Sequence, residues 1–351
     1  MKKILFSILA MAAIAACTKS EIEYNQSQEI GFNIVSGKMT KASVTNTTYP
    51  TSLNMYVFAA TTTDNTDGSA NYINKGEFQY LKVSNDNKNL WAGWMNNAHY
   101  PYYWPNVKHL FFAGVSKSGN VASATTAMNF NTNTLSISDY EAGVGTTALG
   151  DNDLMWFGKT TEYGRDEKTG LLPEYVHVDM YHACSWITVK LYGDDVTAKD
   201  GSAWSIKNIT INGLTTKGDV NLNATTANWT LSTSADDINK QFEVFNGTKI
   251  LTQTATETGY ETISNNTIVL PQASTNMDIT YSYTSPAGVT ITETANVSLA
   301  LDNSAEATDD DNKWKAGYHY IYTVKVTATE ILIQPDAIIW TDQEVTPDVT
   351  I

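Results

Sequence analysis

Short runs in which apolar and polar residues alternate recur along most of the chain, separated by Gly, Asn, Asp and Pro. A period of two places successive side chains on opposite faces of a strand, and helical spacing of apolar residues is hard to find. Residues 277–283 and 289–299 flank Ser-Pro-Ala-Gly at residues 285–288, which predicts a hairpin. Further alternating runs occupy residues 53–60, 204–214 and 266–272. The pattern predicts an all-β protein.

Two longer runs suggest how the chain is divided. Residues 313–333 are expected to form the longest strand, and residues 177–192 form a second long alternating run. One face of the first run carries Tyr318, Tyr320, Tyr322, Val324 and Val326. A charged, glycine-bounded stretch at residues 164–170 precedes the second run and places a boundary near residue 175. We therefore expect two β-sandwich domains of similar size in tandem. Their ranges are residues 30–175 and 176–351.

The start of the chain breaks this pattern. Residues 1–16 begin with two lysines and continue as an apolar run that ends in small side chains, which is typical of a secretory signal peptide. The run is shorter than the roughly 20 residues that cross a bilayer. Cys17 follows directly, and Ile-Ala-Ala-Cys resembles the lipobox of bacterial lipoproteins, in which the cysteine is acylated. Two or more acyl chains hold a protein firmly on a membrane, so residues 17–29 are expected to form a lipid-anchored linker. The alternative is a plain signal peptide with a chance cysteine.

Charge and cysteine content restrict the partners. The chain carries 22 Lys and Arg against 37 Asp and Glu, a net charge of −15. This charge disfavours nucleic acid and anionic lipid as partners. Cys184 is the one cysteine besides Cys17, so no intramolecular disulfide is expected after acylation. We predict that Cys184 is a small buried hydrophobic residue and not a nucleophile.

Candidate catalytic and metal-binding patterns are weak. Residues 143–148 match a dinucleotide fingerprint but lack the flanking strand and helix, so we expect a loop. Residues 63–68 place glycine as a calcium loop does, but Asn74 replaces the final glutamate, which favours a solvated turn. His177 and His182 lie five residues apart on a predicted strand, and therefore on opposite faces. We assign no catalytic residue, metal or cofactor, and expect no enzymatic activity.

Aromatic residues raise one alternative function. The 9 Trp and 19 Tyr of the chain would suit a sugar-stacking platform on an exported protein. Aromatic residues spread over many strands more often serve core and cross-strand packing. A surface-exposed glycan-binding lipoprotein is therefore kept as the alternative function.

A series of short motifs runs in order through the chain. They are YPYYWP at residues 100–105 with HLFFAGV at 109–115, DLM at 153–155, HACSWITVK at 182–190, VLPQ at 269–272, WKAGYHYIY at 314–322 and the run at 331–340. No single motif is specific, but their order across roughly residues 30 to 342 is hard to obtain by chance. Together they resemble the fimbrillin family, the pilus subunits of lipoprotein-derived fimbriae of the Bacteroidota.

The resemblance implies a pilin of two β-sandwiches with transthyretin-like topology. Such a subunit travels to the outer membrane as a lipoprotein, is trimmed by a protease after its first strand, and polymerises at the cell surface by donor-strand exchange. Its partners would be other fimbrial subunits, in a homo- or hetero-polymer, and the membrane before trimming. A receptor on a host or bacterial surface is a further partner, with adhesion or biofilm formation as the role.

Two stretches of the sequence suit this exchange. Ile30, Phe32 and Ile34 alternate with other residues in an expected first strand, residues 30–37, at an edge of the N-terminal sandwich. Lys38 and Lys41 follow, where a trypsin-like or Lys-directed protease would cut. Residues 344–351 form the expected donor strand, because a free chain end is usually polar and this one is alternately apolar. Its apolar residues are Val345, Pro347, Val349 and Ile351.

The chain departs from the family at the trimming site. The family commonly carries arginine there, whereas the one arginine of this chain is Arg165, in the charged connector. Lys41 is therefore our first choice for the processing site and Lys38 the second.

Overall fold

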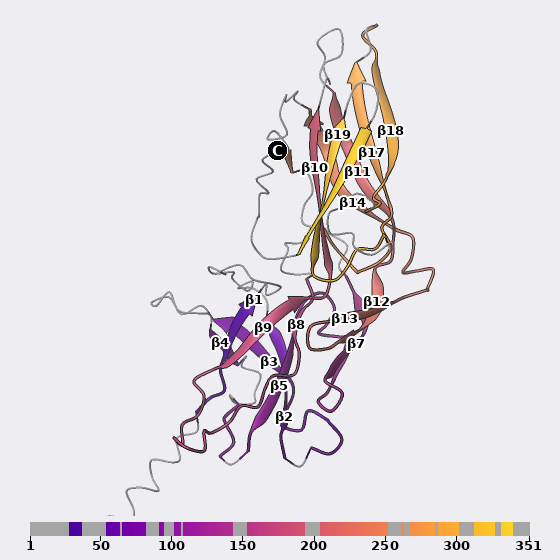
Figure 1. Cartoon of the computed structure of the whole chain (residues 1–351). Helices are drawn as coiled ribbons and strands as arrows, with labels where there is room; N and C mark the ends of the chain where they lie inside the picture. Colours follow the sequence, from indigo (N-terminus) through magenta and orange to yellow (C-terminus); the bar gives the residue numbers. More distant parts are fainter. Residues whose placement is uncertain are drawn as a thin grey trace, which may run out of the picture.

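The fold is that of a computed structural model. It describes residues 28–36, 54–63, 65–81, 91–94, 102–106, 108–142, 153–193, 204–251, 261–262, 267–284, 287–301, 312–326 and 331–339. These ranges contain the strands β1 to β20 and no α-helix, which confirms the all-β prediction. Figure 1 shows two groups of strands stacked along the long axis of the molecule, here termed the lower and the upper unit.

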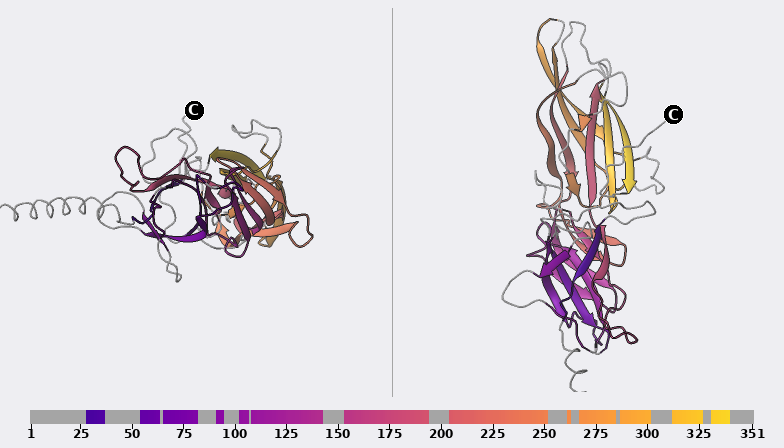
Figure 2. Two further views of the ribbon diagram at one scale, coloured as in Figure 1. Left: turned by 90° about the horizontal axis from the view of Figure 1, so that it is seen from below. Right: turned by 90° about the vertical axis from the view of Figure 1, so that its left-hand side faces the viewer.

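The lower unit contains a sheet closed into a barrel. Its order is β1 (Phe32–Ser36), β4 (Trp91–Trp94), β3 (Ile73–Leu81), β2 (Met55–Thr61), β5 (Leu110–Ser116), β8 (Met155–Phe157) and β9 (Val176–His182). β1 closes the ring by pairing in parallel with β9 and antiparallel with β4, and the left view of Figure 2 looks into this ring. β2 is buried at every position, as expected of a strand with a core on both faces.

A second sheet packs on the outside of this barrel. It consists of β13 (Ala227–Leu231), β12 (Lys217–Leu222), β7 (Thr134–Glu141) and β6 (Thr125–Asn129), in that order. The core between the two layers joins Phe58 and Trp156 of the barrel to Ile137 and Leu222 of the second sheet. This sheet therefore takes strands from both sides of the predicted boundary near residue 175. β9, C-terminal to that boundary, also lies in the lower unit.

The upper unit is a sandwich of two sheets. One has the order β15 (Glu261–Thr262), β10 (Ser185–Gly193), β19 (Tyr318–Val326) and β20 (Ile331–Ile339), with β16 (Thr267–Val269) also paired to β10. The other has the order β14 (Lys240–Ile250), β11 (Ser205–Leu214), β17 (Asn276–Thr284) and β18 (Thr290–Ser298). Between them lies an apolar core that includes Ile187, Ile209 and Tyr322. The tandem β-sandwich prediction is confirmed.

The predicted strand at residues 313–333 and the long alternating run at residues 177–192 are each divided between two strands. The run at residues 313–333 divides into β19 and β20, which pair antiparallel from Tyr318↔Ile339 to Val326↔Ile331. Alternation continues through both strands of a hairpin, so it did not reveal the chain reversal. The run at residues 177–192 likewise divides into β9 and β10. The predicted hairpin at residues 277–299 is confirmed by the pairing of β17 with β18.

The chain passes between the two units more than once. It does so between β9 and β10, between β11 and β12, and between β13 and β14. The β12–β13 hairpin thus returns from the upper unit to the lower one. Within the ranges that the structure describes, no helix is long and apolar enough to span a membrane.

Candidate functional site at the first strand

The first strand is built into the core of the barrel. Ile30 and Phe32 are 0% and 1% exposed, because their period-two spacing points both side chains inward. The Phe32 ring lies edge-on to Phe78 at 4.9 Å between centroids and to Phe112 at 5.4 Å. A third ring, Phe157, is tilted at 6.1 Å. Phe32 therefore fills a slot made of aromatic rings from three other strands.

One side of β1 is hydrogen-bonded to β9 and to the residues that precede β9. β1 and β9 pair in parallel over five residues, from Phe32↔Val176 to Ser36↔Met180. Before β1, the amide of Val176 donates a 2.8 Å hydrogen bond to the carbonyl of Gly31. The Gln28 Nε2 group donates to the carbonyl of Pro173 at 2.9 Å. The backbone attachment on this side thus begins ahead of the strand proper.

The other side is bonded to residues 102–104 and to β4. The Ile30 amide donates to the Tyr102 carbonyl at 2.9 Å, and the Trp104 amide donates to the Gln28 carbonyl at 2.9 Å. β4 adds one antiparallel register pair, Asn33↔Trp91. The prediction that this strand lies at an edge is therefore wrong. Closure of the sheet into a barrel gives the strand a partner on each side.

The space that residues 28–36 occupy, together with the walls around it, is here termed the β1 groove. Its apolar walls include Trp104, Phe112, Met155, Val176 and Met180, which share one buried cluster with Ile30 and Phe32. Burial of a large side chain contributes about 1.5–3 kcal/mol. Loss of β1 would expose this cluster to water, so the groove favours an occupant of similar shape.

The predicted site residues fall partly within this groove. Ile30 and Phe32 lie in it, and the backbone of Ile34 pairs with Val178. The predicted lipidation, processing and donor-strand residues lie outside the described residues and stay predictions. They are Cys17, Lys38, Lys41, Val345, Pro347, Val349 and Ile351.

A buried contact between a histidine and an aspartate, which the sequence did not predict, lies near the passage between the units. Asp153 precedes β8 and His182 ends β9, and the His182 Nδ1 atom lies 2.6 Å from Asp153 Oδ2. His177 on the same strand is exposed, which confirms that the two histidines occupy opposite faces.

Cys184 is fully buried, and burial raises the pKa of its thiol. The thiol therefore stays protonated, as expected of the small buried residue that we predicted.

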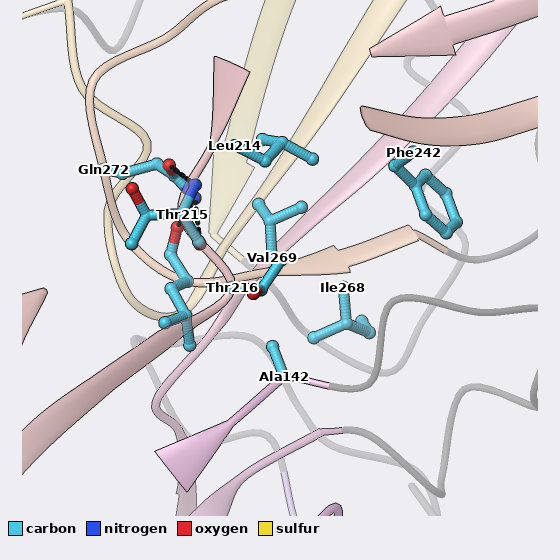
Figure 3. Close-up of a pocket in the computed structure, with 9 residues that line it drawn as sticks. Ala142, Leu214, Thr215, Thr216, Phe242, Ile268, Val269 and Gln272 are labelled. Atoms are coloured by element: carbon cyan, nitrogen blue, oxygen red, sulfur yellow. Dashed lines mark hydrogen bonds between the residues drawn. The ribbon is translucent and has the colours of Figure 1, made fainter. Parts of the chain in front are cut away.

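Figure 3 shows a pocket lined by residues from both units, among them Ala142 after β7 and Leu214 at the end of β11. It is a shallow depression, open to solvent on one side, and its walls are mainly apolar. Gln272 is its most polar side chain, and its amide is bonded to both backbone groups of Thr215, at 2.8 and 3.1 Å. Because these bonds join the segment after β16 to the β11–β12 connection, we assign the amide a structural role.

The other chemical candidates among the described residues also have structural explanations, whereas the predicted loop at residues 143–148 lies outside them. Asp67, in the predicted turn at residues 63–68, accepts a 2.9 Å hydrogen bond from the Ser69 amide, as in an ordinary turn. Among the described residues, no three His, Cys, Asp or Glu side chains are grouped to hold a metal ion. Large aromatic residues such as Trp156, Trp314 and Tyr140 are fully buried and serve packing.

The fold and the β1 groove define a class of protein. Its members are all-β proteins in which a strand near the start of the chain closes the barrel of the lower unit. The chain belongs to the fimbrillin-like family, whose model matches residues 40–346. β1 lies just before the matched residues. Membership of this family indicates a structural, non-enzymatic protein that serves as a fimbrial subunit, assembles with other such subunits and is located in a cell-surface fimbrium.

Solved structures share this fold. A fimbrial protein from Bacteroides vulgatus has 13% sequence identity and a TM-score of 0.58, with 89% of this chain and 99% of that one covered. A candidate cell adhesion protein from Bacteroides ovatus has 10% identity and a TM-score of 0.50, with 90% and 99% covered. At such identities the likeness shows the fold alone. No curated protein matches the chain.

Proposed function

We propose that this protein is exported as an outer-membrane lipoprotein, trimmed next to β1, and assembled into a fimbrium by donor-strand exchange. Cys17 carries the lipid, residues 17–29 form the linker, and the cut falls at Lys41 or, second, at Lys38. The β1 groove carries the proposal. Its occupant fills an apolar core and is bonded on both sides, yet it is joined to the barrel by one connection, residues 37–54. In the fimbrium the subunit acts in adhesion or biofilm formation.

Trimming is needed because the resident strand has the advantage of tethering. A tethered strand competes at an effective concentration of order millimolar, whereas free subunits are of order micromolar. The resident strand is therefore favoured about a thousandfold, or ~4 kcal/mol. A cut between β1 and β2 removes this advantage and leaves a groove that another strand can occupy.

The donor strand of the proposal is residues 344–351. Burying Val345, Val349 and Ile351 contributes about 1.5–3 kcal/mol each, and each strand hydrogen bond adds about 0.5–1.5 kcal/mol. Association costs about 4–15 kcal/mol, so most of the strand must be engaged. Pro347 cannot donate a hydrogen bond, so its nitrogen has to face away from the paired edge.

Replacement of both lysines tests the trimming step. Lys38→Gln combined with Lys41→Gln should leave uncut monomers, and the SDS-resistant ladder of cell-surface fractions should disappear. Lys168→Gln is the matched control, because this exposed lysine lies in the connector before β9 and should leave the ladder intact. Polymers of normal length from the double variant would contradict trimming at this site.

Lipidation is tested separately. Cys17→Ser should abolish metabolic labelling of the protein with fatty acid, while Cys184→Ser, which changes a buried residue, should retain it. Equal labelling of the Cys17→Ser variant and the unchanged protein would contradict the anchor.

A further inference from the structure

The β1 groove has a defined shape along its length. It takes two large side chains, those of Ile30 and Phe32, on either side of a position occupied by glycine. A Cβ atom placed on Gly31 would lie 3.1 Å from Cδ1 and 3.4 Å from Cε1 of the Tyr175 ring. The first distance is shorter than ordinary van der Waals contact between carbon atoms, which is about 3.5–4.0 Å. The residue between the two large side chains must therefore be small.

The strand cannot simply shift away from Tyr175. The residue after Tyr175 donates its amide to the Gly31 carbonyl at 2.8 Å, and one residue later Phe32 begins the parallel pairing with Val176. On the other side, Ile30 is bonded to Tyr102. An added methyl group displaces the tyrosine ring by a few tenths of an ångström, and a β-branched side chain requires a larger displacement.

The slot for Phe32 is equally selective. Two rings meet Phe32 at interplanar angles of 83° and 89°, and Trp104 packs edge-on to one of them, Phe112, at 5.8 Å. Edge-to-face pairs of this kind are worth about 0.5–1.5 kcal/mol beyond the area that they bury. An aliphatic side chain in this slot forfeits those contacts and leaves part of its volume empty.

Residues 345–351 of this chain do not match that shape. Their apolar residues are two valines, a proline and an isoleucine, with no aromatic ring among them. Thr346, Asp348 and Thr350 stand between the apolar positions, so every register that directs the apolar side chains into the core places a branched or charged side chain against Tyr175. The groove and the expected donor strand of the same chain are thus mismatched.

We infer that the vacated β1 groove receives a strand from a different polypeptide, with a large aliphatic residue, glycine or alanine, and an aromatic residue in succession. Tyr175 is the specificity residue, because it excludes larger side chains at the middle position. This inference rests on the proposed function. It implies that this subunit contacts subunits of a different kind in the fimbrium, and that residues 345–351 enter the groove of such a subunit.

The steric contact is tested first in the full chain. Gly31→Thr should lower the unfolding midpoint of the lower unit strongly, and Gly31→Ala slightly. Adding Tyr175→Ala should recover most of the loss caused by Gly31→Thr, whereas Tyr175→Phe, which keeps the ring, should not. A loss from Gly31→Thr that is the same with and without the ring would overturn the role of Tyr175.

The partner is tested by strand exchange. A specific protease site introduced at residues 38–41 allows the folded full chain to be cut, and labelled peptides then compete for the groove. The peptide of residues 28–36 should bind. Its Gly31→Thr and Phe32→Val versions, and the peptide of residues 343–351, should each bind on the order of tenfold more weakly or worse. Tyr175→Ala should restore binding of the Gly31→Thr peptide alone.

The outcomes separate the inference from the proposed function. Equal binding of all four peptides would overturn the inference and leave strand exchange intact. No exchange with any peptide would contradict strand exchange itself, and the partner assignment with it. The full-chain series still reports whether Tyr175 restricts the position of Gly31 in that case.

Discussion

The lower and upper units complete their cores in different ways. The upper sandwich draws its described strands from residues 185–339, and both of its sheets are antiparallel except where β10 lies beside β19. The lower unit needs β1 from the start of the chain and β12 and β13 from beyond β11. Its core therefore depends on one element that a single cut can release. If donor-strand exchange operates as proposed, only the lower unit offers a strand that one cut detaches from the chain, while the upper unit keeps all of its described strands.

The two borrowed elements of the lower unit also differ from each other. β12 and β13 are joined at both ends to strands of the upper unit, and the Trp229 Nε1 group donates to the Ala183 carbonyl at 2.7 Å, next to the passage between units. β1 is joined to described strands at one end. The hairpin therefore ties the units together, while a single cut after β1 would leave β1 without a covalent link to the other described strands.

Deletion of residues 344–351 gives the largest expected effect, because it tests whether this segment belongs to the upper unit or to a neighbour. The monomer should keep its unfolding midpoint, since the last strand of the upper unit, β20, ends at Ile339, ahead of the deleted segment. Assembly into SDS-resistant ladders should be lost completely. Fibres of full length from the truncated protein would show that residues 344–351 are not the donor strand. A monomer that no longer folds would show that this segment belongs to the upper unit of its own chain.

Phe32→Ala should destabilise the lower unit selectively. Removing a buried phenylalanine typically costs about 3–5 kcal/mol, and Phe32 contacts three other aromatic rings. Hydrogen exchange should accelerate in β1, β8 and β9 and change little in β10 and β19. Glu29→Gln, at an exposed position beside it, is the control and should leave both units unchanged. Equal acceleration in the upper unit would show that the two cores unfold together.

The sequence predicted the strands better than their arrangement. Period-two alternation identified β11, β17, β18 and the inward face of β19, because burial on one face leaves that trace. It could not show that β12 and β13 return to the lower unit, since alternation does not tell which sheet a strand joins. The reversal between Val326 and Ile331 was missed for a similar reason, because both strands continue the same pattern.

The candidate site shows the same limit. Alternation at Ile30 and Phe32 predicted an inward-facing strand, and both residues are buried. The requirement for a small residue at position 31 comes from the ring of Tyr175. Tyr175 is distant in sequence, and the parallel pairing of β1 with β9 brings it next to Gly31. Parallel neighbours leave no local signal in a sequence, so the shape of the groove required the structure.

Tyr322→Phe tests the core of the upper unit, as Phe32→Ala tests the core of the lower unit. The Tyr322 hydroxyl accepts a 2.7 Å hydrogen bond from Trp314 Nε1 and donates to the Leu299 carbonyl at 2.9 Å, all in the core. Leaving a buried donor without its partner costs about 1–3 kcal/mol. Denaturant unfolding should show this loss in the upper unit only. Tyr318→Phe, at the rim of the same core, should cost less, and equal costs would contradict the role of the buried network.

An effect that is absent at neutral pH and appears only in acid concerns His319 in the upper unit. This ring stacks on Trp186 at 3.5 Å and 4°, and its Nε2 atom lies 2.8 Å from Thr188 Oγ1. Burial, and then the charge of Lys190, lowers the pKa of His319 from 6.5 to about 3. The unfolded chain therefore binds a proton below pH 6.5 that the folded chain does not, so stability is full above pH 6.5 and falls as pH drops from 6.5 towards 3. In urea titrations, His319→Phe should retain the stack on Trp186, and the stability of this variant should no longer fall through the uptake of a proton at position 319. An identical pH slope for His319→Phe and the unchanged protein would show that other groups produce the dependence.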